Sequence, residues 1–84
     1  MKVKTLHKHY DLIEFHHYID TIDGETITSV LEFLIDSDDI NTIEEEFGEL
    51  FIIETDGQTY VFSNYELSEY YIIDEHYIKV ICVK

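Results

Sequence analysis

Arginine, alanine, proline and tryptophan are absent from this 84-residue sequence, and lysine occurs only five times. With no proline and only three glycines, the chain has no linker rich in these residues, and it contains no internal repeat. The sequence therefore predicts one continuous domain over residues 1–84, a length that folds around a single core. The lack of alanine and arginine beside abundant isoleucine and tyrosine is typical of an AT-rich genome, which indicates a low-GC bacterium or its phages.

Cysteine is nearly missing as well. Cys82 is the only one, so the disulfide framework of a small secreted domain is excluded. Residues 1–8 are followed by polar and acidic residues, and no apolar run approaches the roughly 18 residues of a membrane span. These absences predict a protein of the host bacterial cytoplasm with neither a signal peptide nor a membrane contact. Cys82 lies in an alternating apolar segment, where we expect a buried small hydrophobe rather than a nucleophile.

Positive charge is scarce everywhere. The chain has 19 Asp and Glu residues and a formal net charge of −14. Residues 9–78 hold all 19 carboxylates and neither lysine nor arginine. Such a charge distribution repels nucleic acid and anionic lipid, so it excludes direct binding to either.

The first pattern that is present is a hairpin around Asp23-Gly24. This dipeptide suits a three-residue loop over 22–24 with Gly24 in the left-handed conformation, joining strands over 11–21 and 25–35. The implied register pairs Ile19 with Ile27, Phe15 with Leu31 and Ile13 with Phe33, and it gathers these six residues and Ile35 on one face. Apolar residues in the second arm also recur at helical spacing, so a helix there is the alternative, although the β-branched content favours a strand.

A short helix is predicted next. Residues 36–39 are typical of a helix N-terminus, with Ser37 or Asp38 as the cap, and Gly48 would end the helix after about three turns. Ile40, Ile43 and Phe47 would form its buried face. Glu44, Glu45 and Glu46 would then lie in the last turn, where each carboxylate is unfavourable by about 0.3–1 kcal/mol.

The C-terminal half predicts two more hairpins. Residues 51–55 and 58–62 flank Asp56-Gly57, and a two-residue turn would pair Phe51 with Phe62 and Ile53 with Tyr60. After a link over 64–68, residues 70–73 and 77–83 form a further antiparallel pair joined near Asp74-Glu75. Residues 2–6 would add an edge strand. The expected fold class is α+β: a small antiparallel sheet of about five to six strands, curled toward a half barrel, with one short helix.

The sequence contains no complete motif for metal binding or catalysis. His7, His9 and the His16-His17 pair, near Asp11 and Glu14, offer nitrogen and oxygen ligands, but no second cluster completes a site, so solvent-facing histidines are expected. Residues 36–47 have Ile40, Asn41 and Phe47 at the positions where a calcium loop requires an oxygen ligand, a glycine and a glutamate. We therefore predict no metal, no cofactor and no enzymatic activity. Five tyrosines of the C-terminal half fit either an interface or the sheet core: Tyr60, Tyr65, Tyr70, Tyr71 and Tyr77.

The carboxylates themselves are the remaining candidate for function. Fixed along a folded scaffold, they can imitate nucleic-acid phosphates and occupy the basic groove of a DNA- or RNA-binding protein. Two patches are predicted to contact such a partner. The first comprises Asp38, Asp39, Glu44, Glu45, Glu46 and Glu49. The second comprises Glu66, Glu69, Asp74 and Glu75.

A small acidic chain without alanine or arginine, with Asp-Gly hairpins, a Glu44-Glu45-Glu46 triplet and an acid- and tyrosine-rich C-terminal half, resembles the phage-borne inhibitors of host defence. It is similar in particular to anti-CRISPR proteins that mimic DNA. The resemblance covers composition and general layout, and it transfers no residue's role. It implies an inhibitor that covers the DNA-binding cleft of a CRISPR effector nuclease. The alternative function is a small structural or adaptor protein of a phage or mobile element, which assembles through a sheet edge or its tyrosines and is a possible homodimer.

Overall fold

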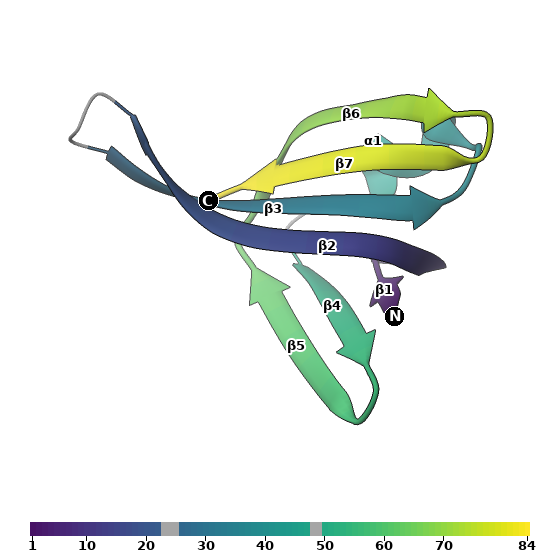
Figure 1. Cartoon of the computed structure of the whole chain (residues 1–84), viewed down its shortest axis with the longest axis horizontal. Coiled ribbons are helices and arrows are strands. Elements are labelled where there is room, and N and C mark those ends of the chain that lie inside the picture. Colours follow the sequence, from purple (N-terminus) through teal and green to yellow (C-terminus); the bar gives the residue numbers. More distant parts are fainter. Residues whose placement is uncertain (23–25, 48–49) are drawn as a thin grey trace.

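The computed structural model describes the backbone of residues 1–22, 26–47 and 50–84, and the side chains of 1–20, 28–47 and 51–84. Its described strands form one antiparallel sheet of seven strands in the order β5-β4-β1-β2-β3-β7-β6 (Figure 1). The strands are β1 (Lys2–Lys4), β2 (His9–Ile22), β3 (Thr26–Asp36), β4 (Leu50–Thr55), β5 (Gln58–Ser63), β6 (Glu66–Asp74) and β7 (Tyr77–Val83). The α+β expectation agrees in outline, but the sheet has more strands than the predicted five to six.

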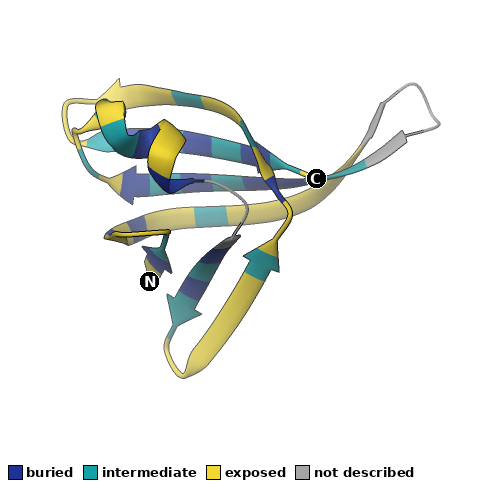
Figure 2. Cartoon of the chain, turned by 180° about the vertical axis from the view of Figure 1, so that it is seen from behind, coloured by how far each residue is buried: buried dark blue, intermediate teal, exposed yellow. Residues whose placement is uncertain are grey.

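The sheet is strongly curved, and its only helical segment among the described residues covers the inner side (Figures 1 and 2). That segment is a 3-10 turn, η1 (Ile40–Thr42), followed by α1 (Ile43–Glu46). The core lies between this segment and the strands. Its largest side chains are aromatic: Phe33 of β3 meets Phe51 of β4 edge to face, with 5.2 Å between ring centroids, and Phe47 lies 5.8 Å from Phe33. These rings join the two halves of the curved sheet.

The first hairpin forms as two strands, so residues 26–35 are a strand and the helical alternative is wrong. Its register differs from the prediction by two residues, since Phe15 pairs with Phe33 and Ile19 with Ser29. The strands extend to Ile22 and Thr26, which leaves 23–25 as the connection in place of 22–24. The predicted Gly24 conformation lies outside the described residues.

The predicted buried face of this hairpin is only partly correct. Leu31, Phe33 and Ile35 are fully buried, but Ile13 and Ile19 are exposed. A bulge between Leu12 and Glu14 turns Leu12 into the core and Ile13 outward. Ile19 is exposed because this end of the β2–β3 hairpin projects beyond the other strands (Figure 1).

The helical segment is much shorter than predicted. Asp39, rather than Ser37 or Asp38, caps η1: its carboxylate accepts the Asn41 N–H at 3.2 Å. Because α1 spans a single turn, the three glutamates at 44–46 lie in a turn that is both its first and its last, and the three-turn helix predicted before them is absent. The predicted buried face is present, with Ile43 and Phe47 buried. The predicted stop at Gly48 lies outside the described residues.

The second hairpin is confirmed in register: Phe51 pairs with Phe62 and Ile53 with Tyr60. Gly57 supplies the positive φ of its two-residue turn, at 81°. The third pair is also confirmed, but β6 begins at Glu66, so the predicted 64–68 link is shorter than expected. The predicted edge strand at residues 2–6 is wrong in position, because β1 lies inside the sheet between β4 and β2.

Candidate acidic interface

The described carboxylates of both predicted patches are exposed, with one exception. Exposed members of the first patch are Asp38, Asp39, Glu44 and Glu45. Exposed members of the second are Glu66, Glu69, Asp74 and Glu75. Glu49 lies outside the described residues, and Glu46 is buried.

Sheet register brings the first patch and the C-terminal end of β6 to the same end of the molecule, whereas Glu66 pairs with Val83 at the opposite end of β6. Tyr77 of β7 pairs with Asp36 of β3 on one side and with Asp74 of β6 on the other. The segment 37–39 that follows β3 therefore lies near the β6–β7 turn, as Figure 1 also shows. Residues distant in sequence thus contribute to one acidic rim, which comprises Asp38, Asp39, Glu44, Glu45, Asp74 and Glu75.

A hydrogen bond joins α1, which carries part of the first patch, to β6, which carries part of the second. The Tyr70 hydroxyl of β6 donates to the Glu44 carboxylate of α1. That bond, with burial and the negative charge of Glu44, raises the pKa of Tyr70 above its ordinary value. Tyr70 therefore stays a neutral donor at physiological pH, and it holds a carboxylate of α1 against β6.

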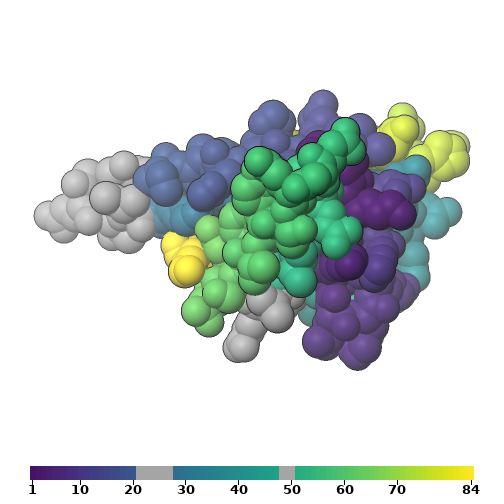
Figure 3. Space-filling model, turned by 90° about the horizontal axis from the view of Figure 1, so that it is seen from below, coloured from purple at the N-terminus to yellow at the C-terminus, as the bar shows by residue number. Residues whose placement is uncertain are grey.

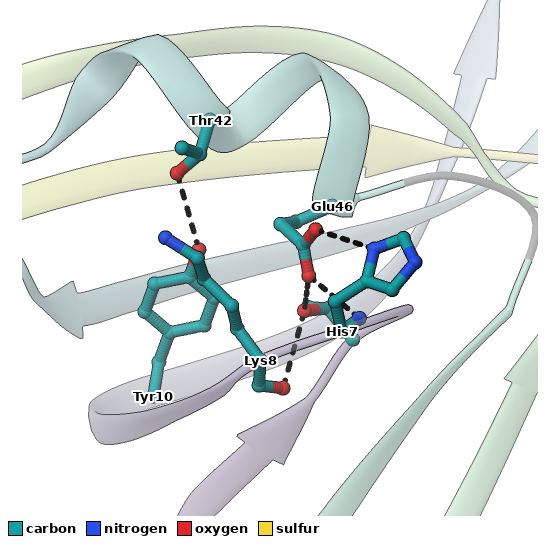
Figure 4. Close-up of polar contacts among 6 residues, drawn as sticks. His7, Lys8, Tyr10, Thr42 and Glu46 are labelled. Atoms are coloured by element: carbon teal, nitrogen blue, oxygen red, sulfur yellow. Dashed lines mark hydrogen bonds and ion pairs between the residues drawn. The ribbon is translucent and has the colours of Figure 1, made fainter.

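Glu46 is a structural residue, so the expectation that it belongs to the contact patch is wrong. It is only 3% exposed, and its Oε1 accepts the Thr5 hydroxyl at 2.7 Å and the His7 backbone N–H at 2.8 Å. Its Oε2 lies 3.1 Å from Nδ1 of His7 (Figure 4). Burial by itself raises the pKa of Glu46, but these hydrogen bonds and the charge of His7 outweigh it, and the net pKa is lowered. The buried carboxylate fastens the segment before β2 to α1.

Sequence reasoning missed this role because nothing in a Glu-Glu-Glu run marks its third member as buried. The helical face offers a partial signal, since Glu46 lies three residues after buried Ile43 and beside buried Phe47. The partners on residues 5–7 come from a distant part of the chain and carry no matching pattern.

Lysine does not neutralise the rim. The two lysine ion pairs of the described residues join Lys4 to Glu54 at 2.7 Å and Lys79 to Glu32 at 3.9 Å. Neither involves a carboxylate of the predicted patches. The eight exposed patch carboxylates thus face solvent without a lysine partner within the described part of the chain.

The histidines and the cysteine considered as candidate ligands or nucleophiles differ in exposure. His7, His9, His16 and His17 are exposed, and the described residues contain no group of three side chains placed to hold a metal. Cys82 is fully buried, as expected, and burial raises the pKa of its thiol to about 12.

The five tyrosines differ in burial. Tyr65 is in the core, where its hydroxyl lies 2.6 Å from that of Ser29. Tyr70 and Tyr77 are half-buried, while Tyr60 and Tyr71 are exposed.

None of the helices among residues 1–22, 26–47 and 50–84 has the length and apolar character needed to cross a bilayer. No family model matches the sequence, and neither a curated protein nor a solved structure is significantly similar to it.

Proposed function

We propose that this protein is a non-catalytic inhibitor that binds a basic nucleic-acid-binding protein by imitating the phosphates of DNA or RNA. The observation that carries the proposal is the acidic rim: six exposed carboxylates from the end of β6, the β6–β7 turn, α1 and the segment after β3, with no lysine paired to them in the described residues. A partner groove lined with lysine and arginine is the complementary surface.

The net charge of the protein favours association with a basic partner. A net charge of −14 steers a basic partner toward the protein and raises the rate of encounter at low salt. The Glu44 carboxylate, which the Tyr70 hydroxyl holds on α1, loses little freedom when it binds. A CRISPR effector nuclease in the cytoplasm of a host bacterium is the specific partner that we propose, in keeping with the resemblance to anti-CRISPR proteins.

A pull-down from bacterial lysate tests the proposal. The tagged protein is used at low salt and again at about 0.5 M salt, where charges are screened within a few ångströms. We expect a basic nucleic-acid-binding protein at low salt that high salt or added DNA releases. Salt-resistant recovery of a virion component would contradict mimicry.

Matched variants separate the rim from net charge. The rim variant carries Asp38→Asn, Asp39→Asn, Glu44→Gln and Glu45→Gln. The control removes the same four charges from exposed residues elsewhere: Asp11→Asn, Glu14→Gln, Asp20→Asn and Asp56→Asn. The rim variant should lose roughly tenfold or more in affinity, and the control much less. Equal losses would mean that total charge, rather than the rim, determines binding.

A second candidate function is that of a phage or mobile-element structural or adaptor protein. It is favoured by three consecutive exposed apolar residues at the end of β6, Tyr71, Ile72 and Ile73. Binding through that surface would be insensitive to salt, and Ile72→Ser with Ile73→Ser would abolish it. The same double substitution should leave binding through the acidic rim intact.

A further inference from the structure

The charge of the molecule is unevenly distributed over the fold. Strands β1, β4 and β5, with their connections, comprise residues 1–8 and 50–63, and these hold three lysines and two carboxylates. The other 17 carboxylates and the remaining two lysines belong to the rest of the chain. The part of the sheet that β5, β4 and β1 form at one edge is therefore nearly neutral, in a protein whose net charge is −14.

Strand β5 lies at the outer edge of this neutral region. Among the described strands it pairs only with β4, so alternate backbone N–H and C=O groups on its other side have no partner strand. Figure 3, which views the molecule from below, shows the β4–β5 hairpin on the near surface.

The two edges of the sheet differ in how they are protected. Edge strands are normally guarded by charges, prolines or bulges. The edge strand β6 has Glu66, Glu69 and Asp74, and its pairing with β7 is interrupted by two irregularities. In contrast, β5 is the only described strand without a charged residue, its pairing with β4 is regular, and Val61 is 64% exposed.

We propose that β5 is a dimerisation edge, which pairs antiparallel with β5 of a second copy of this chain. A strongly basic partner would be drawn to the acidic rim rather than to a neutral edge, and an acidic partner would be repelled by the molecule as a whole. A second copy presents the same neutral strand and keeps the two acidic rims apart. The resulting contact continues the sheet across a two-fold axis.

The sequence of β5 is self-complementary in this arrangement. A two-fold antiparallel pair must place one residue opposite its own copy; Tyr60 and Val61 flank the middle of the strand, and Val61 is the more exposed of the two. With Val61 on the axis, Tyr60 lies opposite Phe62 of the partner subunit, and Thr59 lies opposite Ser63 of the partner subunit. Aromatic and hydroxyl pairs of this kind favour antiparallel strands.

Salt dependence distinguishes this contact from binding at the acidic rim. Two copies of net charge −14 repel each other, so screening by salt should tighten the dimer. Binding of a basic partner at the rim should weaken under the same change. The dimer does not depend on the proposed function, and the two can fail separately.

Sedimentation equilibrium tests the proposal, with the full chain at up to about 1 mM and at about 0.05 and 0.5 M NaCl. Because one strand pair is a small interface, we expect a dissociation constant of roughly 10–100 µM that decreases at the higher salt. Val61→Glu and Val61→Lys should each raise it by about tenfold or more, since like charges then meet on the axis. The control is Ile19→Glu, at a similarly exposed residue (60%) on the distant β2–β3 hairpin.

The lysine variant makes the test independent of net charge. Val61→Lys lowers the overall repulsion, so a dimer formed elsewhere would tighten, whereas a β5 dimer dissociates. Circular dichroism confirms that each variant is folded before it is compared. A wild-type protein that stays monomeric at about 1 mM in high salt would overturn the proposal, as would a dimer that Ile19→Glu weakens as much as Val61→Glu.

Discussion

Replacement of Glu46 should destabilise the protein far more than replacement of its neighbour Glu45, although both belong to the same acidic triplet. Glu46 is buried and accepts hydrogen bonds from Thr5 and His7, while Glu45 is exposed. In Glu46→Ala the His7 N–H loses its acceptor, whereas the Thr5 hydroxyl keeps a second one, the Lys8 carbonyl at 3.2 Å.

The magnitude follows from these contacts. A hydrogen bond to a charged group contributes about 1.5–3 kcal/mol, and a fully buried donor left without an acceptor costs about 1–3 kcal/mol, of which the part-buried His7 N–H incurs a fraction. We expect Glu46→Ala to lower the free energy of unfolding by about 2–4 kcal/mol. Glu46→Gln retains an acceptor oxygen for Thr5 and His7 and should lower it by about 1–2 kcal/mol. The exposed controls Glu45→Ala and Glu45→Gln should stay within about 0.5 kcal/mol of wild type.

Urea denaturation at pH 7, followed by circular dichroism, measures these differences, and its pH dependence supplies a second test. The pKa of Glu46 is lowered in the folded state, so its contribution is present above the unfolded pKa and is lost as pH falls through the folded value. The gap between wild type and Glu46→Gln should thus be full at pH 7 and shrink below the ordinary glutamate value of 4.5. Equal stability of Glu46→Ala and Glu45→Ala would refute the reasoning.

Three further predictions concern the fold. Gly57→Ala should lower the free energy of unfolding in urea by about 1–2 kcal/mol, because φ is +81° at this residue. The added Cβ meets no atom within 4 Å, so the penalty comes from the backbone alone, and a neutral result would contradict it. Phe51→Ala should lower the free energy of unfolding by about 3–5 kcal/mol, since the Phe51 ring packs on Phe33 in the core. Tyr60→Ala, at an exposed position, should lower it much less. Cys82 should react with a thiol reagent at pH 8 only as fast as the protein unfolds, because it is buried and its thiol pKa is raised to about 12. Labelling of Cys82 within seconds under native conditions would show that β7 opens readily.

Local sequence signals predicted the hairpins well where turn chemistry and strand pattern coincide. Asp56-Gly57 fixed both the turn and the register of β4 and β5, because a two-residue turn leaves a single way to align the flanking strands. At Asp23-Gly24 the longer connection permits several alignments, and the predicted register was two residues off. A shift of two preserves the faces, so Leu31, Phe33 and Ile35 were still predicted as buried.

Features that depend on tertiary contacts were not predictable. The bulge at Leu12 and Glu14 exchanges which side chain enters the core, and no turn residue marks it. The central position of β1 depends on pairing with β4, about 50 residues away. A three-residue strand carries no sequence pattern that predicts such a pairing. The predicted patches were composed from charge alone, and only the fold separates buried Glu46 from exposed Glu44 and Glu45.

The measurement that tests the central claim most directly is competition with nucleic acid for the captured partner. A fluorescent DNA or RNA duplex bound to that partner is titrated with this protein while anisotropy is followed. Mimicry through the acidic rim predicts complete displacement of the duplex, with an apparent affinity that falls as salt rises and is lost in the rim variant. A ternary complex, in which the protein binds while the duplex stays bound, would contradict mimicry.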